Sequence, residues 1–187
     1  MKITNLQDFC VQAGYNYHAD LEKLSTICDY TKTRVNNDRH RGEMSYGSEQ
    51  CFLIKAIANS IDTAHFFEIG TGRGTASYAV SLLQSVDRVV TVDIVPHTKK
   101  VHTAIGYQPA YVSNKDICDL IPYEEKSKIS FKHVDDLKEI LEQNENKFDL
   151  AFIDGDHSNF DVIMNDFAMC EWLVRPGGVI LFQISSQ

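Results

Sequence analysis

Several features that this chain lacks restrict what it can be. No apolar run in its 187 residues approaches the roughly 20 that a membrane-spanning helix needs, and no secretory signal opens the chain. Basic residues are outnumbered, with 18 Lys and Arg against 26 Asp and Glu and a net charge of −8. Such a chain lacks the general basic face that grips the phosphates of DNA or RNA. We therefore expect a cytoplasmic protein that binds neither membranes nor nucleic acid.

Paired cysteines are also missing. The chain contains five cysteines at wide spacing, with no C-x-x-C arrangement: Cys10, Cys28, Cys51, Cys118 and Cys170. Their odd number and spacing suit reduced thiols, most of them buried as small apolar side chains. Internal repeats, low-complexity tracts and clear linkers are absent too, so we expect a single domain over residues 1–187.

What the chain does have is a strand, a glycine turn and a helix in direct succession. The apolar run at 65–69 leads into glycines at alternate positions, Gly70, Gly72 and Gly74, and a stretch with one apolar face follows at about 75–85. Glycines are needed in such a turn because side chains forbid its backbone angles and because a ligand must approach the main chain closely. This succession is typical of nucleotide-binding α/β units.

The rest of the chain continues this alternation. Residues 1–62 have helical spacing and predict a cap of helices, the last of them N-capped by Ser48. From residue 63 onward, strands and helices alternate, which predicts a doubly wound, Rossmann-like α/β core with a mostly parallel sheet and helices on both faces. Residues 97–127 are broken into short pieces by glycine and proline, and Pro176-Gly177-Gly178 predicts a turn into the last strand. The expected strands are 65–69, 88–93, 129–134, 148–153 and 179–182, and the expected helices are 75–85, 136–143 and 158–174.

The glycine spacing separates two classes of cofactor. A dinucleotide fingerprint, G-x-G-x-x-G, would place its third glycine at position 75, where this chain has Thr75. Glu68-x-Gly70-x-Gly72-x-Gly74 instead resembles the first motif of class I S-adenosylmethionine (SAM)-dependent methyltransferases. In that family the loop holds the methionine part of SAM. The resemblance implies that the cofactor is bound by Glu68, Gly70, Thr71, Gly72, Gly74 and Thr75. A dinucleotide-binding oxidoreductase remains the less favoured alternative.

Acidic residues end two further strands. Asp93 follows an apolar run about 20 residues beyond the glycines, where a carboxylate can accept both hydroxyls of a ribose. The alternative is that Asp93 caps a helix or sits in a solvated turn. Asp135 and Asp136 follow the next strand, where class I methyltransferases commonly contact the adenine amino group. Either of them could instead cap the following helix, and the sequence does not choose between the two.

A second long motif lies at residues 148–158, Phe-Asp-Leu-Ala-Phe-Ile-Asp-Gly-Asp-His-Ser. Together with the run at 172–182 and the segment at 41–50, it resembles the small-molecule O-methyltransferase branch of the class I family, which includes the catechol-type enzymes and their bacterial relatives. The resemblance covers residues 41–182. It implies SAM as methyl donor, S-adenosylhomocysteine as product, and an oxygen of a small molecule as acceptor.

The chain departs from the catechol-type pattern in its catalytic residues. Those enzymes bind a divalent metal through the aspartate that Asp154 matches and through an acidic or amide pair after their fifth strand, where this chain has Gln183-Ile184-Ser185. Hard divalent cations want several oxygen ligands, so we expect no tightly held metal. The lysine base of that branch corresponds to His157, which can take a proton near neutral pH. We therefore expect Asp154 and His157 to be catalytic, with Asp154 also facing the cofactor. The alternative for His157 is a bond within its own loop or a helix cap.

The last strand also raises a question of assembly. Class I methyltransferases usually continue past the fifth strand, whereas this sequence stops at Gln187. An open edge at that strand would be exposed to pairing with another chain. We expect either a homodimer that covers this edge or a shortened form of the fold. A non-catalytic SAM-binding or scaffold protein is therefore the alternative function.

Overall fold

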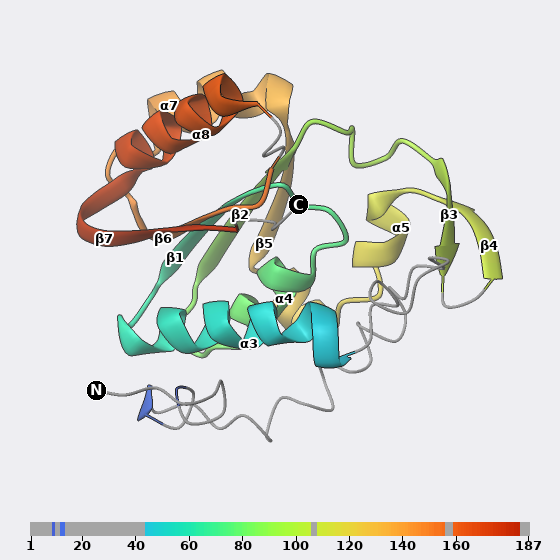
Figure 1. The fold of residues 1–187 in the computed structure, drawn as a ribbon, viewed down its shortest axis with the longest axis horizontal. Coiled ribbons are helices and arrows are strands. Elements are labelled where there is room, and N and C mark those ends of the chain that lie inside the picture. The colour runs from blue at the N-terminus through green and yellow to red at the C-terminus, as the bar shows by residue number, and fades with distance from the viewer. Residues whose placement is uncertain (1–8, 10–11, 14–43, 106–107, 156–158, 184–187) are drawn as a thin grey trace.

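A computed structural model of the protein describes residues 9, 12–13, 44–105, 108–155 and 159–183. Most of the helical cap expected over residues 1–62 lies outside these residues, up to residue 43. In the described part, a parallel sheet stands between two layers of helices (Figure 1). No helix in these ranges combines the length and the apolar character needed to cross a membrane.

The sheet has five strands in the order β5-β2-β1-β6-β7, and each pairs in parallel with its neighbours. The order changes direction beside β1, because the chain runs outward from β1 to β5 and then returns to β6 on the other side. Ligands bind open α/β sheets at the carboxyl ends of the strands near such a switch point. The predicted doubly wound sheet is confirmed. Its strands are β1 (His65–Ile69), β2 (Arg88–Asp93), β5 (Ile129–His133), β6 (Phe148–Ile153) and β7 (Val174–Phe182).

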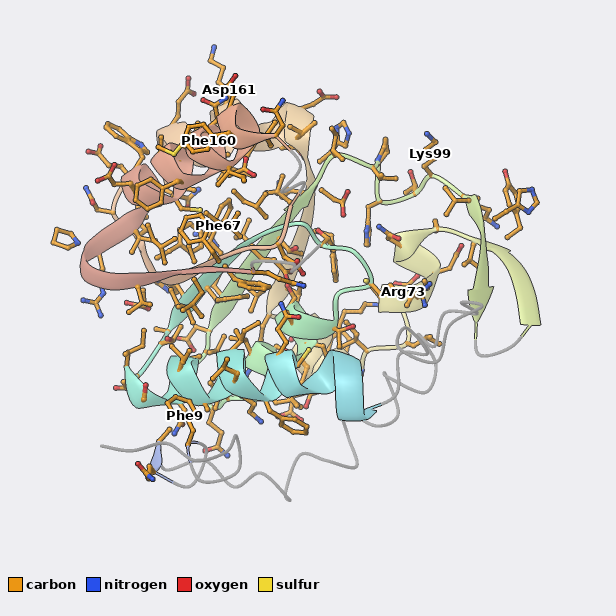
Figure 2. The ribbon with its side chains drawn as sticks, viewed as in Figure 1. Phe9, Phe67, Arg73, Lys99, Phe160 and Asp161 are labelled. Carbon is orange, nitrogen blue, oxygen red and sulfur yellow. The ribbon has the colours of Figure 1, made fainter. Side chains whose placement is uncertain are left out.

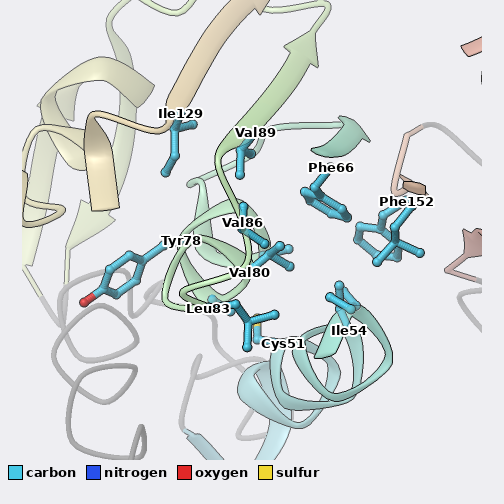
Figure 3. Close-up of a cluster of buried hydrophobic side chains, with 14 of the residues drawn as sticks. Cys51, Ile54, Phe66, Tyr78, Val80, Leu83, Val86, Val89, Ile129 and Phe152 are labelled. Carbon is cyan, nitrogen blue, oxygen red and sulfur yellow. The ribbon is translucent and has the colours of Figure 1, made fainter. Parts of the chain in front are cut away.

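One helical layer consists of α3 (Met44–Ser60) and α4 (Thr75–Ser81), which pack on each other and on the same face of the sheet (Figure 1). The apolar stripe predicted for α3 faces the core, with Phe52, Ile54 and Ala58 buried. Figure 3 shows Ile54 and Cys51 of α3 directed at side chains from β1, β6 and α4. Burial of this stripe fixes α3 beside the glycine turn.

The other layer consists of α7 (Leu137–Gln143) and α8 (Phe160–Leu173). Successive side chains of a strand point to opposite faces of the sheet, so Phe66 joins the α3–α4 cluster while Phe67 joins the second (Figure 2). Phe67 lies against Phe148, with ring centroids 5.3 Å apart. The three described cysteines are buried, as predicted, and burial raises the pKa of Cys118 and Cys170 to about 12.

The sequence predicts only short pieces for the connection from β2 to β5. The structure forms it as an antiparallel hairpin of β3 (Val101–Ile105) and β4 (Gln108–Val112), followed by α5 (Asn114–Cys118) and α6 (Tyr123–Lys126). A capping box between Ser113 and Asp116 starts α5. The hairpin and these two short helices therefore stand where a regular alternation would place a single crossover helix.

Three expected boundaries differ from the structure. The helix α3 begins at Met44, so the prediction that Ser48 is its N-cap is wrong; the glycine before it, at 47, weakens a helix without ending it. The helix α4 ends at Ser81 rather than near residue 85. The strand β7 begins at Val174, which already pairs with Phe148, so the proline and glycines lie within an irregular part of the strand. In the described sheet β7 is an edge strand, and the homodimer expected to cover it stays a prediction.

Candidate active site

The glycine loop connects β1 to α4 at the carboxyl edge of the sheet. Its three glycines have φ values of +94° at Gly70, +48° at Gly72 and +75° at Gly74, a region that side chains rarely adopt. A Cβ at Gly70 would collide with the backbone carbonyl of Asp154, and one at Gly74 would lie 2.8 Å from Sγ of Cys118. A Cβ at Gly72 would meet nothing within 4 Å. Gly70 and Gly74 thus permit close packing, whereas Gly72 faces open space.

Asp93 ties this loop to the end of β2. Its Oδ2 accepts a hydrogen bond from the backbone N–H of Gly72 (3.0 Å), and its Oδ1 accepts one from the N–H of Val95 (2.8 Å). The turn role that the sequence left open is therefore present. Each carboxylate oxygen retains a further lone pair, and the side chain also borders the cavity described next. The ribose role of Asp93 stays a prediction.

A cavity of about 440 Å³, here called the large cavity, opens at the carboxyl ends of β1, β2 and β6. Its walls are mostly apolar, and three carboxylates enter it from different elements: Asp93, Asp154 and Asp166. Its size and lining fit a small molecule with an apolar body and a few polar groups. The remaining lining residues are Ile69, Gly70, Gly72, Val92, Ile94, Val134, Leu137, Gly155, Val162 and Met169.

A second hollow of about 180 Å³, here called the small cavity, lies on the side of the loop that faces α3 and α4. It shares Gly70, Gly72 and Asp154 with the large cavity. Arg73, on the side of the loop near α5 (Figure 2), borders the small cavity as well. A ligand extended across the shared residues would occupy both cavities. The other lining residues are Gln50, Cys51, Glu68, Thr71, Thr75 and Ala76.

Glu68 lies in the floor of the small cavity and is almost fully buried, with 1% of its surface exposed. Its Oε2 accepts hydrogen bonds from Ser77 Oγ (2.5 Å) and Thr91 Oγ1 (2.7 Å). Thr91 uses its proton in this bond, so Thr71 Oγ1 donates to Thr91 Oγ1 (2.7 Å). Burial raises the pKa of Glu68 to about 8, against the lowering effect of these two bonds. At neutral pH this group is therefore largely a neutral acid.

Asp154 follows β6 and stands where the two cavities meet. Burial raises the pKa of its carboxyl group to about 6, so it is mostly ionised at neutral pH. The amide of Gln183, directly after β7, lies against this carboxylate and against the amide of Gln50 on α3. Gln50 was not predicted to belong to the site, and Gln183 was considered only at the position of the missing metal-binding pair. Nothing in a lone glutamine indicates a site, because its role depends on which elements the fold brings together.

The acidic pair after β5 lies outside both cavities. Asp135 is mostly exposed, with its Oδ2 3.0 Å from Nδ1 of His133. Asp136 accepts a hydrogen bond from the backbone N–H of His133 (3.0 Å), which caps the 3₁₀ turn η2 (Val134–Asp136). Val134 and Leu137 form the cavity wall instead. The Asp136 carboxylate therefore caps this turn, and it makes no capping bond to the following helix α7 (Leu137–Gln143). The adenine role of either acid stays a prediction. Asp166, which does border the large cavity, was not predicted.

The described residues do not fit a divalent metal site. Within the described ranges, no group of three or more His, Cys, Asp or Glu side chains is arranged to hold an ion. Asp154 contributes one carboxylate, and the two neighbouring groups are neutral amides, whereas hard cations prefer several charged oxygens. His157, the expected base, and Asp156 beside it lie outside the described residues. The catalytic role of His157 stays a prediction.

The class of the molecule follows from its similarity to one protein family. The profile of the family described as "Methyltransferase domain" matches residues 67–183, which is more than half of the chain. The match includes Gly70, Gly72 and Asp154, the residues that both cavities share. The chain belongs to this methyltransferase family. No curated protein matches its sequence.

Solved structures resemble this methyltransferase over most of its length. The O-methyltransferase TomG from Streptomyces achromogenes, in complex with SAM, is 18% identical, with a TM-score of 0.54; the match covers 96% of this methyltransferase and 66% of TomG. An O-methyltransferase from Bacillus cereus, in complex with S-adenosylhomocysteine (SAH), is 17% identical, with a TM-score of 0.56 and coverage of 94% and 73%. At these identities the likeness shows the fold. The methyltransferase spans about two thirds of the length of TomG.

Proposed function

We propose that this methyltransferase binds SAM across its two cavities and transfers the methyl group to an oxygen of a small molecule, leaving SAH. The observation that carries the proposal is that the two cavities meet at Gly70, Gly72 and Asp154. The large cavity is apolar and suits the adenosine, while the small cavity is polar and suits the amino-acid end. The junction between them then receives the sulfonium that carries the methyl group.

The residues at this junction have distinct tasks under the proposal. Gly72 presents bare backbone to the ligand, because nothing occupies the space beside it. The carboxylate of Asp93 accepts the ribose hydroxyls while its bond to Gly72 holds the loop in place. The ionised carboxylate of Asp154, which also lines the small cavity, faces the ammonium group at the amino-acid end of the ligand, and this positive charge favours its ionised form further.

Methyl transfer needs little covalent help from the protein. The acceptor oxygen displaces the sulfur in line, and holding the two reactants close and aligned supplies much of the rate. The proton of the acceptor hydroxyl must leave, and we propose His157 as the base that takes it. Transfer to oxygen is supported by the solved O-methyltransferases that share the fold.

An assay of methyl transfer tests the proposal. The purified protein is incubated with SAM and a panel of phenols, sugar hydroxyls and carboxylates, and SAH formation and methylated product are measured by mass spectrometry. We expect at least one acceptor to give both products. SAM that binds but is never consumed with any acceptor would favour the alternative of a non-catalytic SAM-binding protein.

A further inference from the structure

Three side chains from distant parts of the chain meet beside the small cavity. Gln50 comes from α3, Asp154 from the end of β6, and Gln183 from the end of β7. The placement of Gln183 is set by the backbone, since its N–H donates to the carbonyl of Ile153 (3.0 Å) and extends the β6–β7 pairing by one residue. This register brings the amide of Gln183 to the carboxylate of Asp154, which is the residue after Ile153.

The chemistry of the three groups fixes how the amide of Gln183 is turned. An ionised carboxylate only accepts hydrogen bonds, so an amide oxygen facing it would leave both groups unsatisfied. With its nitrogen toward Asp154, Gln183 shares one N–H between the two carboxylate oxygens, at 3.1 Å for Oδ2, and donates the other to Oε1 of Gln50 at 3.2 Å. Gln50 thereby fixes the amide from the other side.

We propose that Gln183, braced by Gln50, is the positioning residue that holds the Asp154 carboxylate toward the amino-acid end of the bound cofactor. The inference rests on the proposed function, because it assigns a role within the same cofactor site. Gln183 stands where a catechol-type site would need a second metal ligand, and its N–H groups occupy the carboxylate oxygens that a cation would need.

A neutral donor suits this position for an electrostatic reason. A lysine or arginine there would neutralise Asp154 and weaken its attraction for a positively charged ligand. A second carboxylate would repel Asp154 or recruit a cation between the two. An amide orients the carboxylate and leaves its negative charge available. Asp154 is half-buried, so a rotation of its unheld carboxylate would move charge away from the junction of the two cavities.

The test compares two ligands that differ at one end. SAH has the amino-acid end, whereas 5′-methylthioadenosine has the adenosine and sulfur without it. Gln183→Met removes the donor and keeps the length of the side chain. The matched control is Gln143→Met on α7, where Gln143 donates to Glu139 (3.1 Å) on an exposed surface. Dissociation constants are measured by calorimetry, and folding is checked by thermal unfolding.

We expect Gln183→Met to weaken SAH about tenfold, the scale of one lost hydrogen bond to a charged group, and to leave 5′-methylthioadenosine within twofold. Gln143→Met should change neither. Unchanged SAH affinity in Gln183→Met, or an equal loss for both ligands, would overturn the positioning role. If the unaltered protein binds no SAH, the proposed function itself fails, so the two failures are distinguishable.

Two further measurements examine the brace and the absence of a cation. Because Gln50 acts on the Asp154 carboxylate only through Gln183, the Gln50→Met and Gln183→Met losses should not add, and the double variant should resemble Gln183→Met within twofold. Additive losses would show that Gln50 acts independently. Addition of MnCl₂ should leave SAH affinity unchanged. A tightening by Mn²⁺ that disappears in Asp154→Asn would show a metal on Asp154 and overturn the proposal.

Discussion

At the scale of single residues, a substitution at Gly72 can separate ligand binding from folding. Gly72→Val should abolish SAM binding while leaving the protein folded, because the new side chain enters space that both cavities share. Gly177→Val is the matched control, since Gly177 also has a positive φ (+83°) and open space around it but lies outside both cavities. Calorimetry with SAM and thermal unfolding provide the two measurements. A folded Gly72→Val protein with normal affinity would remove the glycine loop from the site.

A pair of variants can test the proposed ribose role of Asp93. Asp93→Ala should weaken SAM by about 1.5–3 kcal/mol, the scale of a lost hydrogen bond to a charged group. Asp135→Ala is the comparison, because Asp135 is mostly exposed and borders neither cavity. An unchanged dissociation constant in Asp93→Ala would leave Asp93 with its turn bonds to Gly72 and Val95 alone.

Glu68 predicts a pH dependence of stability. Burial raises its pKa from the ordinary 4.5 to about 8, so the folded protein holds this proton more tightly than the unfolded chain does. Its contribution to stability is complete below about pH 4.5 and is lost as the pH rises toward 8. Glu68→Gln stays neutral throughout. Its melting temperature relative to the unaltered protein should therefore increase between pH 5 and pH 8, and a constant difference over that range would refute the buried neutral acid.

The sequence predicts some residues of the site far better than others. Glu68, Gly70, Gly72 and Asp93 could be found because strand ends and glycine turns are local features, and the structure places them together. The cluster of Gln50 and Gln183 could not be found, since each is an ordinary polar residue until α3 and β7 bring them to Asp154. Asp166 was missed for the same reason, because it belongs to a helix whose position over the cavity is a tertiary property.

At the scale of elements, the irregular start of β7 offers a test of packing. Gly178 is packed tightly, and a Cβ there would collide with Val174 Cγ1 and lie 2.7 Å from the carbonyl oxygen of Asp149. Gly178→Ala should lower the free energy of unfolding by about 3 kcal/mol, at the upper end of ordinary overpacking costs. Gly177→Ala has open space and should cost about 1 kcal/mol through its positive φ alone. Equal urea midpoints for the two variants would contradict this packing.

The sequence predicted the strands of the main sheet better than it predicted the β3–β4 hairpin. The four strands β1, β2, β5 and β6 end within one residue of their expected positions. The apolar runs of β1, β2 and β6 are mostly buried on both faces, whereas β5, at the edge of the sheet, buries only Ile129. The β3–β4 hairpin was missed, since its pairing is between two short segments with no strong turn signal. Pro109 within β4 also argued against a strand, although an isolated two-stranded ribbon has free edges that tolerate proline.

At the scale of the whole molecule, the strand order places everything that the proposal uses at one edge of the sheet. The carboxyl ends of β1, β2 and β6 and the loops after them supply Gly72, Asp93 and Asp154 to the two cavities, and Gln183 after β7 lies against Asp154. The two helical layers hold this edge from opposite faces, and α3 reaches it through Gln50. We propose that the cap and the core form one domain for this reason.

The central claim is that these two cavities form one SAM site. Isothermal calorimetry of the unaltered protein with SAH, with NAD as the competing class of cofactor, tests it most directly. We predict that one SAH binds per chain and that NAD shows no measurable binding. The SAH signal should be lost in Gly72→Val and retained in Gly177→Val. Binding of NAD without SAH, or SAH binding that Gly72→Val leaves intact, would contradict it.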